Sequence, residues 1–500
     1  MRDKHTPRAW GERQAGTLTV VCVLLLAVLL NMVFYALTET FSLYLYAETK
    51  YEHTIGQGVK DSLAAANGAG DEVEIIFCMP EDALQDDPIY RLVRETARQL
   101  DEAFDFLSVR AVNAVARPDE VDDYRYVLQK DEQTGTYTRV EAYTVGRESV
   151  IVTGPLSHTV LSMPSFFVLD DNNSIEAYRG EEVMTGMILY ALSDTHPKAY
   201  ITQSHGESAG TGLYDLLVCA GYELTPIDLL SQTPDDTDGI FVISNPTYDF
   251  YRGGTGVEAE IEKLRAYMEA GGFVMIFLDP LACWDGEGQC KLPNLFALMA
   301  EWGMSPVPAI IRDNAASVTS DGYTLVVAYA ENEEAQALRQ TAQPYNTSRI
   351  ILREAAALSV LEAEGKTAAP LLRTSATAAT YFGDRQLSAE GNYAVAGVSV
   401  TDAPASGRAG GMSVCTSYYL GARDALGSDE YGNTSFLYAL LSRYRGQVTP
   451  LGATKLRVGS TLLRDLTVRE ARLWALAVVG LPTLTVAAVS FVILRRRRGR

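Results

Sequence analysis

Polar side chains that could carry out acid–base or metal chemistry follow three strand-like apolar runs in the middle of the sequence. An imidazole beside carboxylates can move protons or bind a metal ion. Ligands of open α/β sheets bind beyond the carboxyl ends of the strands, so the residues directly after these runs form the candidate binding cluster. They are Ser204, His205, Gly206, Glu207, Asn245, Asp249 and Asp279. Their arrangement does not identify a particular reaction. We favour a structural role for these loops over a ligand site.

The usual signatures of catalysis are missing where such a sheet would need them. No GxSxG nucleophile elbow and no cysteine follows the run Phe241–Ser244, so a hydrolase or amidotransferase would lack its attacking atom there. No Walker A sequence occurs, and no GxGxxG follows a strand, so nucleotide chemistry would belong to another chain. We expect no catalytic residues and no cofactor.

The six cysteines form no CxxC pair and no zinc-like cluster, so we expect no metal or redox centre. Cys283 and Cys290 bracket a polar loop, and outside the cytoplasm they could form a local disulfide. Two unpaired thiols fit the spacing equally well. Cys78 stands alone after a strand, which excludes a dithiol mechanism and favours a scaffold over a lone reactive thiol.

The first region has the element order of a thioredoxin-like fold. Residues 73–78 read as a strand, and Asp87-Pro88 offers an N-cap followed by proline at the first helical position. The next predicted elements are strands at 107–112, 149–153 and 166–169 and a helix bearing Val183 and Met187. A break at 193–197 ends this region.

The second region alternates strands and helices more regularly. Strands are predicted at 198–203, 222–227, 239–244 and 272–278, with helices at 210–220 and from Thr255, where Glu258 completes a capping box, to Gly271. Runs that are apolar throughout are typical of strands buried on both faces, so we predict a parallel, doubly wound, flavodoxin/amidotransferase-like sheet. Further predicted strands cover 323–328, 349–352, 392–400 and 412–418, and a helix covers 434–444.

Two uncharged apolar stretches, Thr17–Leu37 and Leu473–Leu494, are each long enough to span a bilayer as a helix. We favour an uncleaved anchor for the first over a cleaved secretory signal, because its run is long and no small-x-small site ends it. Basic residues flank both spans on their terminal sides. Both termini are therefore expected in the cytoplasm and the central region outside it.

The length of 500 residues exceeds what one hydrophobic core usually supports, so several domains are expected. The formal net charge is −21, and the basic ends leave the middle more acidic still. Such a surface repels phosphate backbones and anionic lipid, so nucleic-acid binding is not expected. The predicted parts are a tail (1–16), a span (17–37), a thioredoxin-like domain (38–195), an amidotransferase-like domain (196–450, with an insertion at about 283–388), a linker (451–472), a span (473–494) and a basic tail (495–500).

With these residues in view, the chain resembles the GldG-type auxiliary subunits of ABC transporters, the family that includes the gliding-motility component. The resemblance covers most of the chain and rests on Tyr178-Arg179-Gly180-Glu181-Glu182, on Ala199 to Glu207, and on Leu264 to Pro280. Ser204 replaces the first glycine of the family's Gly-His-Gly-Glu pattern. The resemblance implies a non-catalytic domain, related in fold to amidotransferase-like and intraflagellar-transport modules, that works beside a permease and a separate cytoplasmic ATPase. It assigns no active-site residues.

We therefore expect a non-catalytic auxiliary component of a bacterial ABC transport system, held in the cell membrane by two helices. Its extracytoplasmic domain would bind substrate, envelope material or a partner protein. Two other functions remain open: an extracellular hydrolase that uses His205 with nearby carboxylates, and a purely structural envelope protein.

Overall fold

The computed structural model describes residues 54–67, 70–130, 136–169, 174–208, 211–254, 259–346, 348–402, 408–427, 429–457 and 495. Both predicted membrane spans lie outside these residues. Among the described residues, no helix combines the length and apolar character that crossing a bilayer requires. The chain divides into two units, Met1–Thr54 and Ile55–Arg500, and every element below belongs to the second.

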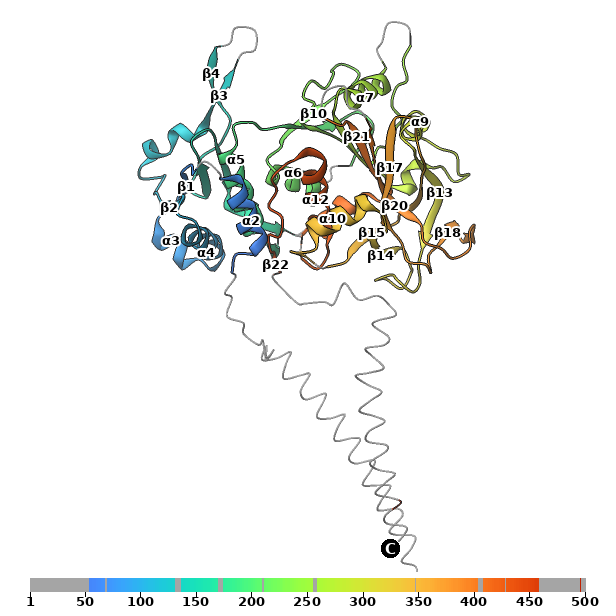
Figure 1. Ribbon diagram of the computed structural model, residues 1–500. Helices are drawn as coiled ribbons and strands as arrows, with labels where there is room; N and C mark the ends of the chain where they lie inside the picture. Colours follow the sequence, from blue (N-terminus) through green and yellow to red (C-terminus); the bar gives the residue numbers. More distant parts are fainter. Residues whose placement is uncertain are drawn as a thin grey trace, which may run out of the picture. The chain divides into compact units, whose positions relative to one another are not determined.

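A four-stranded mixed sheet forms in the first region, in the order β2-β1-β5-β6. Figure 1 labels β1 and β2 of this sheet. Its strands are β1 (Val73–Phe77), β2 (Leu107–Ala111), β5 (Ser149–Thr153) and β6 (His158–Ser162). β1 runs parallel to β2 and antiparallel to β5, which is antiparallel to β6. The helices of this region are α2 (Gln57–Ala66), α3 (Glu81–Asp86), α4 (Pro88–Ala103) and α5 (Gly180–Leu192).

The predicted β-α-β unit is confirmed, but the fourth strand of this sheet is not the predicted 166–169. β6 takes that place. Its sequence lacks a clear apolar pattern, because only Val160 within it is buried. β7 (Phe167–Leu169) instead pairs with β8 (Ile175–Tyr178), which also pairs with β22 (Leu456–Arg457). β3 (Tyr126–Lys130) and β4 (Tyr137–Glu141) form a separate hairpin. Short 3-10 helices lie at Pro118–Glu120, Asp122–Arg125, Met163–Phe166 and Tyr418–Gly421.

The largest sheet has nine strands in the order β10-β9-β11-β12-β21-β20-β17-β14-β15. The first five are parallel: β10 (Glu223–Ile227), β9 (Lys198–Thr202), β11 (Ile240–Ser244), β12 (Phe273–Phe277) and β21 (Gly411–Cys415). The last four are antiparallel to their neighbours: β20 (Ala394–Thr401), β17 (Lys366–Arg373), β14 (Thr324–Tyr329) and β15 (Ile350–Arg353). The protein is thus a mixed α/β structure with parallel-containing sheets, and the predicted all-parallel sheet describes only part of it.

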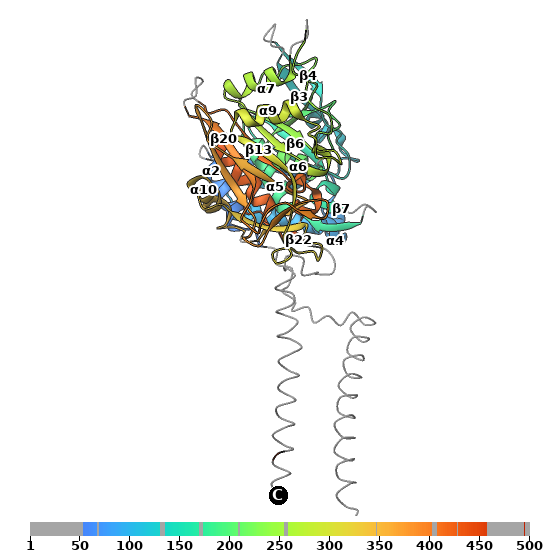
Figure 2. The same cartoon turned by 90° about the vertical axis from the view of Figure 1, so that its right-hand side faces the viewer.

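Helices cover both faces of the parallel strands, because alternate side chains of a strand point to opposite faces. Val242 and Met275 pack in a core with α5, α6 (Thr211–Cys219), α10 (Glu333–Ala342) and α12 (Asn433–Arg445). Phe241 and Ile276 pack in a second core with α7 (Glu260–Glu269) and α9 (Pro293–Glu301), which lie side by side in both views (Figures 1 and 2). The uniformly apolar runs of β11 and β12 follow from this two-sided burial.

Residues 283–388, predicted as an insertion, contribute β14, β15 and β17 to the nine-stranded sheet. The same stretch forms all four strands of a second sheet, β16-β13-β18-β19, from β13 (Met304–Arg312), β16 (Ala356–Val360), β18 (Ala379–Phe382) and β19 (Arg385–Gln386). β13 and β17 shift register at Pro306 and Pro370, since proline has no N–H to donate to a neighbouring strand. Proline and irregular pairing therefore weaken the strand pattern here.

α7 begins later than the predicted start at Thr255. The helix begins at Glu260, after Ala259, and Thr255 and Glu258 lie outside the described residues. Ile261, Leu264 and Met268 are buried along one face of this helix. The buried first residue, Glu260, makes a tertiary contact described below.

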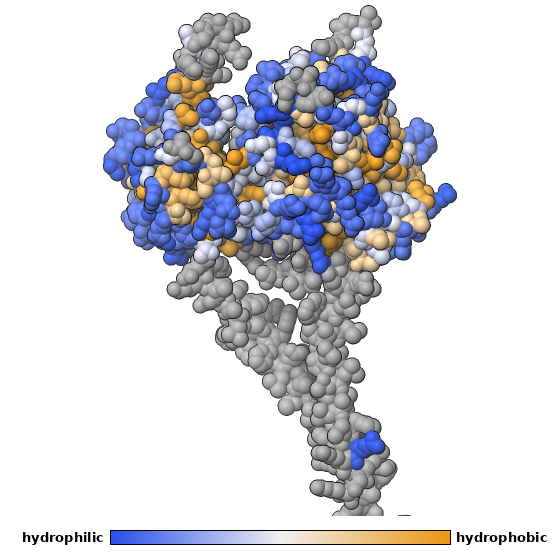
Figure 3. All heavy atoms as spheres, viewed as in Figure 1, coloured by the Kyte–Doolittle hydropathy of each residue, from blue (hydrophilic) through white to orange (hydrophobic). Residues whose placement is uncertain are grey.

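Two short helices, α8 (Pro280–Cys283) and α11 (Arg423–Leu426), complete the described elements. Hydrophilic residues predominate on the face shown in Figure 3, and apolar residues form smaller groups there. Exposed large apolar side chains include Val115, Leu128 and Leu156. Most of the large apolar side chains are otherwise in the cores described above.

The cap of α4 provides a local test of the fold. Asp87 Oδ1 accepts hydrogen bonds from Ile89 N at 2.7 Å and Tyr90 N at 3.4 Å. Asp87→Ala leaves these N–H groups without that acceptor, so the free energy of unfolding should fall by about 1 kcal/mol. Chemical denaturation of the solubilised chain measures this change. Asp86→Ala, at an exposed position one residue earlier, is the control, and an equal loss in both variants would contradict the cap.

Candidate functional site

Five residues of the predicted binding cluster lie at the topological switch point of the parallel sheet: Ser204, His205, Gly206, Glu207 and Asn245. From β9 the chain passes to β10 on one side and then to β11 on the other side. The carboxyl ends of β9 and β11, at Thr202 and Ser244, therefore border a crevice of the kind in which open α/β sheets bind ligands. Ser204 to Glu207 and Asn245 follow these two ends, as the sequence predicted.

The backbone turns sharply after both strands. Ser204 has φ 81° and Asn245 has φ 52°, in the left-handed region that non-glycine residues rarely adopt. Such conformations cost on the order of 1–3 kcal/mol and persist where the surroundings hold them, often at functional sites. Gly206 also has a positive φ, 70°, and a Cβ there would lie 2.0 Å from Thr247 Oγ1. A side chain at Gly206 would therefore collide with the neighbouring loop.

His205 is buried and held by two carboxylates. Its Nδ1 lies 3.1 Å from Glu207 Oε1, and its Nε2 lies 3.2 Å from Glu260 Oε2. The imidazole stacks on Phe250 with ring centroids 3.9 Å apart, and only 4% of the residue is exposed. Both ring nitrogens are thus engaged inside the protein.

Backbone hydrogen bonds tie this histidine to three segments. His205 N donates to Glu207 Oε2 at 2.8 Å. Thr247 N and Tyr248 N both donate to His205 O, at 2.8 and 2.9 Å. Glu260 Oε2 also accepts from Tyr251 N at 2.7 Å. The arrangement joins the loop after β9, the loop after β11 and the first turn of α7.

The carboxylates keep the imidazole charged. Burial alone would lower the pKa of His205, but its hydrogen bonds to the carboxylates of Glu207 and Glu260 outweigh burial and raise that pKa to about 9. Burial works against ionisation of Glu207 as well, yet the bond to His205 helps to hold its pKa below the usual value. At neutral pH His205 is therefore an imidazolium, which cannot accept a proton as a general base.

Asp249 and Asp279 do not take the predicted place beside His205, because their carboxylates cap helices. Asp249 accepts from Asn294 N at 2.9 Å and from Leu295 N at 3.2 Å, in the first turn of α9. Asp279 accepts from Leu281 N at 2.9 Å and caps α8, and burial raises its pKa. N–H groups at helix starts need such acceptors, which accounts for both aspartates.

The sequence analysis missed Glu260 and Ser208. Glu260 lies 55 positions from its histidine partner in an ordinary amphipathic pattern, so no local signal marks it. Ser208 is the serine of Gly206-Glu207-Ser208-Ala209-Gly210, which does have GxSxG spacing, although after β9 rather than β11. Ser208 Oγ accepts from Asn245 Nδ2 at 3.2 Å, and Asn245 Oδ1 is a buried acceptor without a hydrogen-bond partner among the described residues.

A cavity of about 440 Å³ opens beside this turn. Its polar lining comes from the strand-end residues, and its apolar lining comes from β9 and the edge strand β10. The lining residues are Ile201, Thr202, Gln203, Ser204, Gly206, Glu207, Tyr214, Leu224 and Pro226. The crevice can therefore accept a ligand next to Glu207 while His205 stays enclosed.

Cys283 and Cys290, the possible disulfide pair, are free thiols in the structure. Cys283 is buried and Cys290 half-buried, and burial raises the pKa of Cys283 to about 12. Lys291 N donates to Cys283 O at 2.9 Å and Trp284 bridges Cys290, so backbone contacts close this loop. Cys78 is also buried, with its pKa raised to about 11 by burial, which suits a core residue better than a reactive thiol.

Comparisons with known proteins add little. No model of a known protein family matches the chain, and no curated protein matches it in sequence. Among solved structures, the chain is similar to one described as the mmIFT52 N-terminal domain. That similarity has a TM-score of 0.37 and 15% sequence identity, and covers 49% of this chain and 96% of the other.

The raised pKa of His205 predicts a pH-dependent stability. Because the folded pKa of about 9 exceeds the unfolded value near 6.5, the contribution is complete below pH 6.5 and is lost as pH rises through 9. The free energy of unfolding should fall by about 3 kcal/mol over that range. His205→Gln should flatten this dependence in chemical denaturation.

His158→Gln is the matched control, because burial lowers rather than raises the pKa of His158. That variant should keep the loss of stability between pH 6.5 and 9. A wild-type protein that is equally stable at both pH values would show that His205 is not held as a cation.

Proposed function

We propose that the chain is a non-catalytic, membrane-anchored auxiliary component of a bacterial ABC transport system. In this proposal two helices, over 17–37 and 473–494, hold residues between them outside the cytoplasm beside a permease and a separate ATPase. The resemblance to GldG-type subunits motivates the assignment.

One buried carboxylate carries the proposal, because it joins the two ends of the folded unit. Glu181 Oε1 accepts a hydrogen bond from Gly56 N, near the start of the described residues. Glu181 Oε2 accepts from Thr454 N at 2.7 Å and from Thr454 Oγ1, near their end. Glu181 is fully buried. The segments that lead toward the two predicted spans thus meet at a single side chain.

Close packing supports the same pairing of the two ends. A Cβ at Gly58 would lie 2.4 Å from Leu451 O, so only glycine allows this approach. Tyr345 Oη donates to Asp61 at 2.9 Å, and β22 pairs with β8 at Leu456. Ends that lie side by side suit a domain held on one side of a membrane by two anchors.

The topology also supports the finer fold assignments within this proposal. The order β2-β1-β5-β6, with β1 and β2 parallel and the other pairs antiparallel, followed by α5, is the arrangement expected of a thioredoxin-like domain over 38–195. The five parallel strands with helices on both faces suit an amidotransferase-like domain over 196–450.

The geometry of His205 favours binding over hydrolysis. In a serine hydrolase, the histidine needs one ring nitrogen for the nucleophile and a carboxylate on the other. Here carboxylates occupy both nitrogens, and Ser208 is hydrogen-bonded to Asn245 instead. We propose that the crevice beside the turn after β9, which β10 and Tyr214 of α6 also line, binds substrate, envelope material or a partner without chemistry.

Glu181→Gln tests the junction of the two ends. The amide loses the charge that strengthens these hydrogen bonds, so the free energy of unfolding should fall by roughly 1.5–3 kcal/mol. Limited proteolysis should also cut sooner near Gly56 and Thr454. Glu269→Gln, at an exposed helix end, is the control. Unchanged cleavage in Glu181→Gln would show that this carboxylate does not hold the two ends.

Co-purification tests the transporter assignment. After mild solubilisation, the tagged full-length chain should bring down a multi-span permease and an ATPase in constant ratio. Protease added to intact protoplasts should cleave the central region and spare the termini. A chain that purifies alone from its native membrane, or whose central region is protected, would contradict the proposal.

The hydrolase alternative makes a separate prediction. If the protein hydrolysed an ester or amide, Ser208→Ala would abolish turnover of an activated ester while the fold stayed intact. We expect no turnover above background in the wild type and no difference in Ser208→Ala. A serine-dependent burst of product would overturn the non-catalytic assignment.

A further inference from the structure

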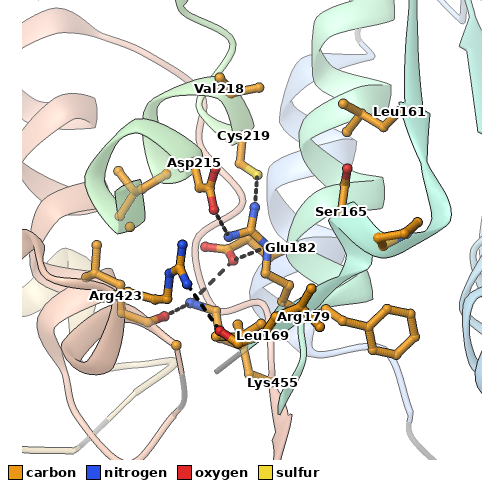
Figure 4. A pocket seen from close by; sticks show the side chains of 17 residues that line it. Leu161, Ser165, Leu169, Arg179, Glu182, Asp215, Val218, Cys219, Arg423 and Lys455 are labelled. Atoms are coloured by element: carbon orange, nitrogen blue, oxygen red, sulfur yellow. Dashed lines mark hydrogen bonds and ion pairs between the residues drawn. The ribbon is translucent and has the colours of Figure 1, made fainter. Parts of the chain in front are cut away.

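A second cavity, of about 480 Å³, lies between elements of the two predicted domains (Figure 4). β7 and the start of α5 contribute from the first region, and α6, α11 and Lys455 contribute from the second. Clefts between domains are common ligand sites. This cavity is separate from the crevice beside Glu207, with which it shares no lining residue.

One wall of the cavity is charged, and most of its charges are paired internally. Arg179 Nη1 lies 3.1 Å from Asp215 Oδ2. Lys455 Nζ lies 3.3 Å from Glu182 Oε2, whose other oxygen accepts from Tyr438 at 2.7 Å. These contacts fix the wall, because Glu182 and Lys455 are both buried.

Arg423 supplies the unbalanced charge. Its Nη1 donates to Leu169 O at 3.2 Å, and among the described residues no carboxylate forms an ion pair with it. Among the described lining residues there are three cations, Arg179, Arg423 and Lys455, and two anions, Glu182 and Asp215. Arg423 is exposed, so its remaining N–H donors are accessible from the cavity mouth. A surplus cation in so acidic a chain favours an anionic ligand.

Most of the remaining lining is apolar. It includes Leu161, Phe167, Val168, Leu216 and Val218. A ligand that fills the cavity needs an apolar part to cover this wall, since an anion alone would leave the wall in water.

The charges also select the kind of anion. A guanidinium offers a planar fork that matches a carboxylate, and one unpaired charge balances a single negative charge. Asp215 and Glu182 in the same wall repel a second negative charge, which disfavours a phosphate dianion. We propose that this cavity binds a small amphiphilic carboxylate, about the size of an N-acylated apolar amino acid, with its carboxylate on Arg423. This proposal does not rest on the transporter assignment.

Binding to the full-length protein in lipid nanodiscs tests the proposal. N-acetyl-leucine is the probe, and N-acetyl-leucinamide is the matched control ligand with the same apolar body and no charge. By calorimetry the acid should bind at least about tenfold more tightly than the amide. Equal affinities, or no heat from the acid at millimolar concentration, would overturn the proposal.

Variants locate the site. Arg423→Gln should weaken binding of the acid by about tenfold and leave the amide unchanged. Arg265→Gln removes a guanidinium that pairs with Glu301 and lines no part of this cavity, and it should bind both ligands as the wild type does. Ser165→Trp should fill the mouth and block both. An unchanged affinity for the acid in Arg423→Gln would overturn the proposal.

Hydrogen exchange in the wild type keeps the test independent of any variant's folding. The acid should slow exchange in peptides that contain 179–182 and 423–427. Slowing confined to 203–208 would place the ligand in the other crevice and overturn the assignment.

Discussion

The first turn of α5 is the contact on which the rest of the structure depends. Arg179, the residue just before α5, pairs with Asp215 of α6. In the first turn, Glu181 accepts hydrogen bonds from Gly56 and Thr454. Glu182 accepts a hydrogen bond from Tyr438 of α12 and pairs with Lys455. All but two residues of α5 are buried, and the buried residues include both Glu181 and Glu182. Buried charges of this kind are tolerated only when fully paired, and losing one partner is strongly destabilising.

This turn explains why the core does not stop at the predicted domain boundary. The largest apolar cluster includes side chains of β1, α5, α6, β11 and α12. Gly186 lets α5 approach α6 closely, since a Cβ there would lie 2.6 Å from Cys219 O. The cavity that contains Arg423 borders this contact, so a ligand bound there would touch the wall formed by Glu182 and Lys455.

The turn after β9 is also held by buried charges that pair with one another. An imidazolium between two carboxylates, stacked on Phe250, holds three segments together where strained backbone at Ser204 and Asn245 would otherwise relax. The crevice beside it keeps a preformed shape, which lowers the ordering cost of binding. This histidine ties the loop after β9 to the loop after β11 and to the first turn of α7.

Local patterns in the sequence determined much of the fold. Asp87-Pro88 marks the start of α4, the apolar runs of β11 and β12 indicate two-sided burial, and the order of elements places Ser204, His205 and Glu207 after a parallel strand. Each of these signals depends on residues within one or two turns of chain. The GxSxG spacing around Ser208 is equally visible in the sequence, but it follows β9 rather than β11.

The tertiary structure alone determines which distant residues form contacts with one another. Nothing near Glu260 shows that it binds a histidine 55 positions away, and nothing near Glu181 shows that it joins Gly56 to Thr454, because such pairs form only when distant segments pack. For the same reason Asp249 and Asp279 became helix caps, and residues 283–388 became part of the main sheet. Sequence spacing reports which face a residue occupies. Burial and pairing between distant segments determine what that residue contacts.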